Sequence, residues 1–209
     1  MDIRLEIPAD YRETETLTRE AFWNQYVPGC AEHLVLHQLR RHPDFVPALD
    51  FVAEEDGRLV GHIAYTRAVI CREGRDSLAV LCLGPVSVLP ERQRAGVGSA
   101  LIRHSLEAAR NLGFPAVCLY GDPRYYHRFG FRCAEKYDIR TEDSFYAAAL
   151  HALELKPGAL ADAAGRFAES PGYAVDEKTL AAFDAGFAPK HREETPSQQE
   201  FRFLASLRY

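Results

Sequence analysis

Residues 84–102 read GPVSVLPERQRAGVGSALI, an apolar run that leads through a glycine-containing loop into an amphipathic pattern of helical period. The loop QRAGVG, residues 93–98, joins the predicted strand directly to the predicted helix. Backbone N–H groups at a helix N-terminus have no partner within the helix, and the helix dipole makes that end positive. Glycines at 96 and 98 let phosphate oxygens approach the main chain closely. This stretch therefore predicts a binding site for a pyrophosphate group.

The same two glycines also have a purely structural interpretation, in which they only ease a tight turn between strand and helix. The neighbouring Arg92 and Arg94 favour the anion site. A nucleotide-hydrolysing P-loop is disfavoured because no GK[ST] follows the glycines. The dinucleotide fingerprint of hydride-transferring enzymes is disfavoured as well, because its third glycine is missing and the preceding strands are expected to be antiparallel.

The sequence before this stretch predicts a strand, two helices and a three-stranded meander. Residues 2–7 (DIRLEI) alternate in polarity, which is typical of a strand. Asp10 is a potential N-cap for a helix that runs to about residue 23, and CAEHLVLHQLRRH predicts a second helix that Pro43 stops. Asp56-Gly57 is a strong hairpin signal between apolar runs. We expect three antiparallel strands: two within residues 48–70, one on each side of this turn, and a third over residues 77–89.

The sequence after it predicts one long helix and one parallel strand. Val97, Leu101 and Leu112 share one helical face, and Gly113 is a plausible C-cap. PAVCLYGD predicts a buried strand, and because a helix separates it from the preceding strand, we expect the two to pair in parallel. The remaining expectations are strands over 145–155 and near 166–168, helices over about 176–185 and 196–207, the latter N-capped by Thr195, and a flexible connector over 189–196.

Composition restricts the class of protein. The chain has 209 residues, a formal net charge of -5 and scattered basic residues, so we expect neither nucleic acid nor a membrane as partner. The charged start MDIRLEIPADYRE is unlike a signal peptide, which predicts a cytoplasmic location. Monomer and homodimer both stay open. Residues 1–155 are expected to form the main domain, and residues 156–209 an extension that packs on it.

Cysteine and histidine patterns give no metal site. The five cysteines are odd in number and widely spaced, which predicts reduced core residues. His33 and His37 are four residues apart on a predicted helix, but no HExxH accompanies them. No metal is therefore expected, and Trp23, Tyr26 and His33 stay open as acceptor contacts.

With these elements in place, the sequence resembles the GNAT superfamily of N-acetyltransferases. Residues 93–98 match the signature Q/R-x-x-G-x-G/A, and Tyr126 to Phe131 (YHRFGF) match the Y-x-x-x-G-F segment. FVAEEDGRLVGHI, LGPVSVLPE and GDPRYYHRFGF are similar to the YhbS-like group of predicted acetyltransferases. The resemblance implies an α/β (α+β) fold with a mixed, mainly antiparallel central sheet, flanking helices and a splay between strands four and five.

The resemblance also implies a function and its site. The expected activity is transfer of an acetyl group from acetyl-CoA to the primary amine of a small molecule or peptide, by direct attack in a ternary complex. Tyr126 is the implied general acid for the departing thiolate, with Tyr125 as a second choice, and a main-chain N–H near Val88 is the implied oxyanion donor. The implied coenzyme-binding residues are Val86, Ser87, Val88, Gln93, Arg94, Ala95, Gly96, Val97, Gly98 and Ser99.

The general base is not predicted. Many members of the superfamily carry a Glu on the fourth strand, whereas SLAVLCLGPVSV offers only Ser77, Cys82 and Ser87 as polar groups. Glu54, Glu55, Asp122 and His127 stay open for this role. Three alternatives to the acetyltransferase also stay open: a non-catalytic acyl-CoA-binding sensor or scaffold, an enzyme that uses a longer acyl donor, and a protein that self-associates through its C-terminal aromatic residues.

Overall fold

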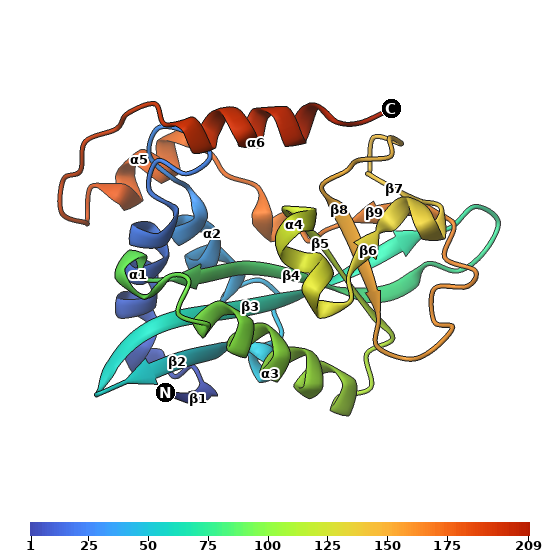
Figure 1. Cartoon of the computed structure of the whole chain (residues 1–209), viewed down its shortest axis with the longest axis horizontal. Coiled ribbons are helices and arrows are strands. Elements are labelled where there is room, and N and C mark those ends of the chain that lie inside the picture. The colour runs from blue at the N-terminus through green and yellow to red at the C-terminus, as the bar shows by residue number, and fades with distance from the viewer.

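A computed structural model describes the whole chain, residues 1–209. Nine strands form one mixed sheet in the order β1-β2-β3-β4-β5-β8-β6, with β9 pairing to β3 and β7 (Figure 1). All neighbours are antiparallel except the pairs β4–β5 and β7–β9. The strands are β1 (Asp2–Leu5), β2 (Phe51–Glu55), β3 (Arg58–Cys71), β4 (Leu78–Val88), β5 (Ala116–Tyr120), β6 (Arg132–Cys133), β7 (Ile139–Arg140), β8 (Leu150–Glu154) and β9 (Gly165–Ala168).

Helices cover both faces of this sheet because successive side chains of β3 point to opposite sides. A Cβ at Gly61 would lie 2.7 Å from the Val97 side chain, so this position faces α3. Tyr65, four residues on, reaches the same helix and bonds Ser105 Oγ at 2.8 Å. Ala64 points the other way and packs against α2. The helices are α1 (Tyr11–Phe22), α2 (Glu32–Leu39), α3 (Val97–Asn111), α4 (Pro123–Tyr126), α5 (Glu177–Asp184) and α6 (Pro196–Ser206).

The sheet splits between β4 and β5, as expected. Their parallel pairing consists of Leu81 with Val117 and Cys82 with Cys118. Beyond Cys82, β4 pairs only with β3, and its register shifts where Gly84 and Pro85 stand opposite one β3 residue. An extra residue of this kind bends a strand and increases its twist. The two strands therefore diverge, and helices from both faces of the sheet contribute residues to the space between them.

A buried ionic cluster fixes α1 and α2 to the first strands. Arg40 lies 2.6 Å from Glu6, and His62 lies 2.7 Å from Asp50. One polar atom each of Glu6, Asp50 and His62 lie within 4.8 Å of one another. Burial raises the pKa of Glu6 to about 7 and that of Asp50 to about 6, and it lowers the pKa of His62 to about 4. These shifts favour the uncharged forms, so the cluster carries less charge than its composition implies.

The C-terminal residues differ in part from the prediction. The strand expected from residue 145 begins at Leu150, because residues 141–145 form a turn that Thr141 holds by hydrogen bonds to Phe145, and residues 146–148 pair with residues 207–209. Thr195 precedes α6, but its hydroxyl donates to Asn24 O instead of capping the helix. Within the predicted connector 189–196, residues 189–195 have no regular structure, yet hydrogen bonds tie them to the residues that follow α1. The connector is therefore anchored rather than free.

Two further findings concern the chain as a whole. None of its helices combines the length and the apolar character needed to cross a membrane. All five cysteines are free, and Cys30, Cys82 and Cys118 are buried, as predicted.

Candidate active site

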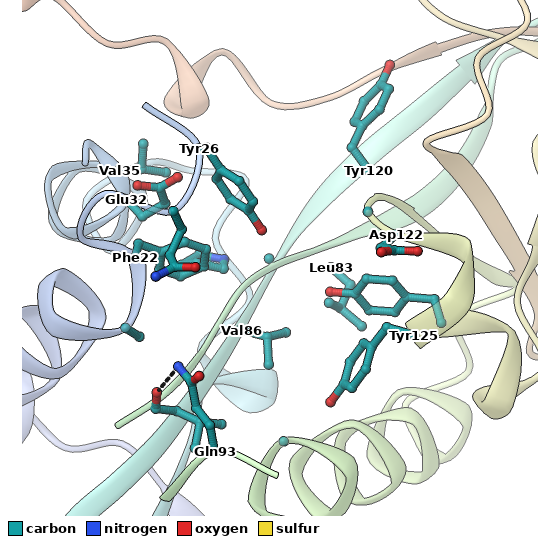
Figure 2. Close-up of a pocket in the computed structure, with 18 of the residues that line it drawn as sticks. Phe22, Tyr26, Glu32, Val35, Leu83, Val86, Gln93, Tyr120, Asp122 and Tyr125 are labelled. Atoms are coloured by element: carbon teal, nitrogen blue, oxygen red, sulfur yellow. Dashed lines mark hydrogen bonds between the residues drawn. The ribbon is translucent and has the colours of Figure 1, made fainter. Parts of the chain in front are cut away.

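A cleft of about 980 Å³ occupies the gap between β4 and β5. One wall comes from the end of α1, the following loop and the start of α2, and the opposite wall comes from β5 and α4 (Figure 2). Figure 2 shows Phe22, Glu32 and Val35 together on the first wall, with the Tyr26 hydroxyl directed toward the middle of the cleft. The floor is β4, and the loop before α3 closes one end.

The loop before α3 exposes unpaired backbone donors to this cleft. Gly96 is the N-cap of α3 at φ 93° and provides no capping side chain, and Arg94 also has positive φ, 62°. The first backbone bond of the helix runs from Ala100 N to Gly96 O at 2.9 Å. The three amides between these two residues therefore have no acceptor within the helix. Together with the helix dipole they provide the donors that an anion at this end of α3 would need.

The predicted coenzyme-binding residues divide into two groups. Those that line the cleft are Val86, Val88, Gln93, Arg94, Gly96, Gly98 and Ser99. The side chains of Ser87, Ala95 and Val97 do not line it. Ser87 points to the opposite face of the sheet and donates to Thr18 Oγ1 at 3.0 Å, and Val97 is buried in the core. These three residues could therefore contact a ligand in the cleft only through their main-chain atoms.

The backbone of β4 presents polar groups to the cleft. Leu89 N–H donates to Val60 O on β3 at 3.0 Å. Because successive N–H groups of a strand point in opposite directions, the amide of Val88 points away from β3, toward the gap. The Val88 carbonyl accepts a hydrogen bond from Gln93 Nε2 at 3.2 Å, which Figure 2 shows as a dashed line. The Val88 N–H thus has no partner on β3 and is available to a ligand.

Tyr126 lies in the cleft with its hydroxyl free of protein partners. Its ring packs against the Gly121 backbone, where a Cβ would overlap it, and makes edge contacts with Tyr125 and Phe131 at centroid distances of 5.1 and 5.9 Å. Burial raises the pKa of the Tyr126 phenol well above its usual value of 10, so the hydroxyl keeps its proton at neutral pH. No hydrogen bond contributes to that shift. The hydroxyl is a proton donor without a bound acceptor.

Tyr125 has a different position in the same cleft. A Cβ added to Gly98 would lie 2.8 Å from the Tyr125 hydroxyl oxygen, so this hydroxyl reaches the N-terminus of α3. It therefore faces the first turn of α3, whereas Tyr126 packs on the Gly121 backbone at the end of β5.

Among the four acid or base residues left open from the sequence, only Asp122 lines the cleft. Glu54 is paired with Arg4 at 3.0 Å, and Glu55 is hydrogen-bonded to Arg92. Asp122 accepts from Arg124, which lowers its pKa and makes it a weaker base. His127 is exposed and makes an edge contact with the ring of His151 outside the cleft.

The structure adds acidic and aromatic residues that sequence reasoning missed. Glu32 lines the cleft from the first turn of α2, and Glu169 and Tyr173 line it from the C-terminal extension. These residues are distant in sequence from the signature loop, so no motif connects them to it. Of the three aromatic and histidine residues considered as acceptor contacts, Tyr26 lines the cleft, while Trp23 bonds His191 O at 2.8 Å and His33 lies 3.0 Å from Asp184.

Comparison with known proteins finds relatives that are named as N-acetyltransferases. The sequence model described as "Acetyltransferase (GNAT) domain" matches residues 3–134. The chain is 32% identical to the uncharacterized N-acetyltransferase YhbS of Escherichia coli over 151 residues, which are 69% of this chain and 84% of YhbS. It is 44% identical to the uncharacterized N-acetyltransferase YjhQ of Escherichia coli over 89 residues, 42% of this chain, so it spans about half (49%) of that relative.

Two solved structures are similar over most of the chain. The Escherichia coli YhbS structure in complex with CoA has a TM-score of 0.71 at 28% identity and covers 82% of this chain and 91% of its own. A GNAT family acetyltransferase from Brucella melitensis in complex with acetyl-CoA has a TM-score of 0.62 at 33% identity. This match covers 83% of this chain and 97% of the Brucella chain.

Proposed function

Since the chain belongs to the GNAT family of N-acetyltransferases, we propose that it transfers the acetyl group of acetyl-CoA to a primary amine by direct attack within a ternary complex. The observation that carries this proposal is the cleft, which lies at the split in the sheet and is lined by residues from both faces. On one face lie the uncapped amides of α3, and on the other lie residues from α1 and α2. Two substrates can therefore enter from opposite sides and meet beside β4.

The coenzyme side of the proposal rests on the anion site. The pyrophosphate of acetyl-CoA would accept hydrogen bonds from the amides of Val97, Gly98 and Ser99, and Arg94 would add positive charge. The outward-pointing backbone of Val86 and Val88 would pair with the pantetheine amides as an added strand does. The CoA and acetyl-CoA complexes of the two similar structures support this assignment.

The chemistry follows from the groups around β4. The lone pair of the amine nitrogen attacks the thioester carbonyl carbon, and the Val88 N–H stabilises the oxyanion that forms. The C–S bond then breaks, the sulfur takes the Tyr126 proton, and the nitrogen gives one proton to solvent water, so that amide and free thiol balance thioester and neutral amine. The pKa of Tyr126 exceeds the value of about 8.5 for a thiol, so the phenolate must be reprotonated from solvent, which holds the proton that the nitrogen released.

Initial-rate kinetics with both substrates varied tests the ternary complex. Direct attack predicts reciprocal plots that intersect, because both substrates are bound before any product leaves. Parallel plots, with acetylated protein detected by mass spectrometry in the absence of amine, would contradict direct attack and indicate a covalent intermediate.

A further inference from the structure

Glu32 is a cleft carboxylate without a cationic partner. It belongs to the first turn of α2, and its Oε2 accepts the Ala31 N–H at 3.0 Å. Burial is the largest influence on its ionisation and raises its pKa, and no basic side chain opposes that effect. Asp122, on the opposite wall, is different because Arg124 lies 2.7 Å away and neutralises it. The carboxylate of Glu32 is thus available to a positively charged ligand.

Glu169 is a second such carboxylate and lies on the rim of the same cleft. It follows β9, close enough to Tyr120 and Tyr173 for its charge to raise the pKa of both phenols. Burial and the charge of Glu142 raise the pKa of Glu169 itself, and no cation counters them. Two unpaired carboxylates from distant parts of the chain therefore line one cleft.

The charges of the cleft are separated along its length. Its basic residues are Arg92 and Arg94, in the loop before α3, and Arg128, after α4. The wall from α1 and α2 contributes no basic residue. Negative groups of a ligand are therefore favoured near α3, and positive groups near Glu32 and Glu169.

Apolar and aromatic surface accompanies the carboxylates. Phe22, Val35 and Tyr26 line the wall that carries Glu32, and Figure 2 shows Tyr120 across the cleft from them. Phe201 of α6 lies over Tyr26, with ring centroids 4.6 Å apart. In addition, Glu200 of the same helix pairs with Arg124 at 3.1 Å. Helix α6 therefore contacts both walls, so the space beneath it suits a small acceptor better than a folded protein.

We propose that the acceptor is a small aliphatic diamine, whose second positive charge and apolar spacer are recognised by Glu32, Glu169 and the aromatic residues that line the same cleft. This inference rests on the proposed acetyltransferase function and specifies its substrate class. In the complex, one carboxylate would hold the charged end while the neutral form of the other amine attacks the thioester. The attacking nitrogen, already neutral, gives one proton to water as the amide forms, and the sulfur takes its proton from Tyr126.

The test compares three acceptors of equal chain length: 1,4-diaminobutane, 1-aminobutane and 4-aminobutanoate. Thiol release is measured with the full chain and saturating acetyl-CoA. We expect kcat/KM for the diamine to exceed that for the monoamine by about tenfold, the effect of one charge-assisted hydrogen bond, with the amino acid slowest. In the double variant Glu32→Gln/Glu169→Gln the preference should fall close to one, mainly through a rise in KM for the diamine.

Glu107→Gln is the matched control, because Glu107 is an exposed residue of α3 that does not line the cleft. It should keep the wild-type preference, and a calorimetric titration should show unchanged acetyl-CoA binding in every variant. Faster turnover of the monoamine or the amino acid by the wild-type protein would overturn the diamine proposal and leave the acetyltransferase function intact. Binding of acetyl-CoA without thiol release from any primary amine would overturn both.

Discussion

Replacement of Tyr126 by phenylalanine isolates one hydroxyl group in the cleft. The ring contacts with Tyr125, Phe131 and the Gly121 backbone are kept by phenylalanine. No protein group bonds the Tyr126 hydroxyl, so its removal leaves no buried donor or acceptor without a partner. We therefore expect the melting temperature of Tyr126→Phe to stay within about 2 °C of wild type.

The expected loss is in turnover. A positioned general acid contributes about 10²–10⁴-fold to rate, which corresponds to roughly 3–5 kcal/mol of activation free energy. Since the hydroxyl acts on sulfur only when the C–S bond breaks, we expect kcat to fall by about 10²-fold or more while the dissociation constant of acetyl-CoA changes by less than about twofold. Thiol release monitors the first quantity and calorimetric titration the second.

Tyr125→Phe is the informative comparison, because its hydroxyl faces the N-terminus of α3 rather than the end of β5. It should raise the KM for acetyl-CoA more than it lowers kcat. The reasoning is refuted if Tyr126→Phe retains kcat within about threefold of wild type, and the acid role moves to Tyr125 if Tyr125→Phe alone loses turnover.

Three further perturbations follow from the same structure. Gly98→Val should raise the dissociation constant of acetyl-CoA, measured by calorimetry, at least about tenfold. A Cβ at this position would lie 2.8 Å from the Tyr125 hydroxyl and 3.4 Å from Val88 Cγ2. Unchanged affinity would argue against coenzyme binding at the start of α3. Arg40→Met should lower the free energy of unfolding, measured in urea, by about 3 kcal/mol at pH 8, because it leaves the buried Glu6 without its cation. The loss should be smaller at pH 5, where Glu6, with a pKa of about 7, is protonated. An equal loss at both pH values would count against this explanation. Burial lowers the pKa of His33 from 6.5 to about 4, so between these pH values the unfolded chain binds a proton that the folded chain does not. The wild-type protein therefore loses stability as pH falls through this range, and His33→Gln should reduce that loss of unfolding free energy by about 3 kcal/mol. Urea unfolding at a series of pH values would contradict this if the unfolding free energy fell with pH as steeply in the variant as in wild type.

Local patterns were sufficient for the central part of the fold. The turn at Asp56-Gly57, the helical period from Val97 and the apolar run before Tyr120 each report on contiguous residues, and the structure confirms the elements they predicted. The parallel pairing of β4 with β5 followed from the helix between them. The short strands β6 and β7, of two residues each, carry no period that a sequence can display.

The acceptor side of the cleft was beyond sequence reasoning for a physical reason. Glu32 and Glu169 are separated by most of the chain, and whether a carboxylate is free or paired depends on contacts in three dimensions. Glu55 has the same side chain, yet it is bonded to Arg92 and lies outside the cleft. Likewise, a helix was expected over residues 196–207, but its contact with Tyr26 through Phe201 required the fold.

The most direct test of the account is to identify both products of one reaction. Purified protein is incubated with acetyl-CoA and a mixture of primary amines, and mass spectrometry measures free coenzyme A together with any amine that has gained an acetyl group. The account predicts one acetylated amine for each coenzyme A released, with both products reduced about 10²-fold in Tyr126→Phe. Release of coenzyme A with acetate and no acetylated amine would contradict transfer to nitrogen, even if acetyl-CoA binds at the loop before α3.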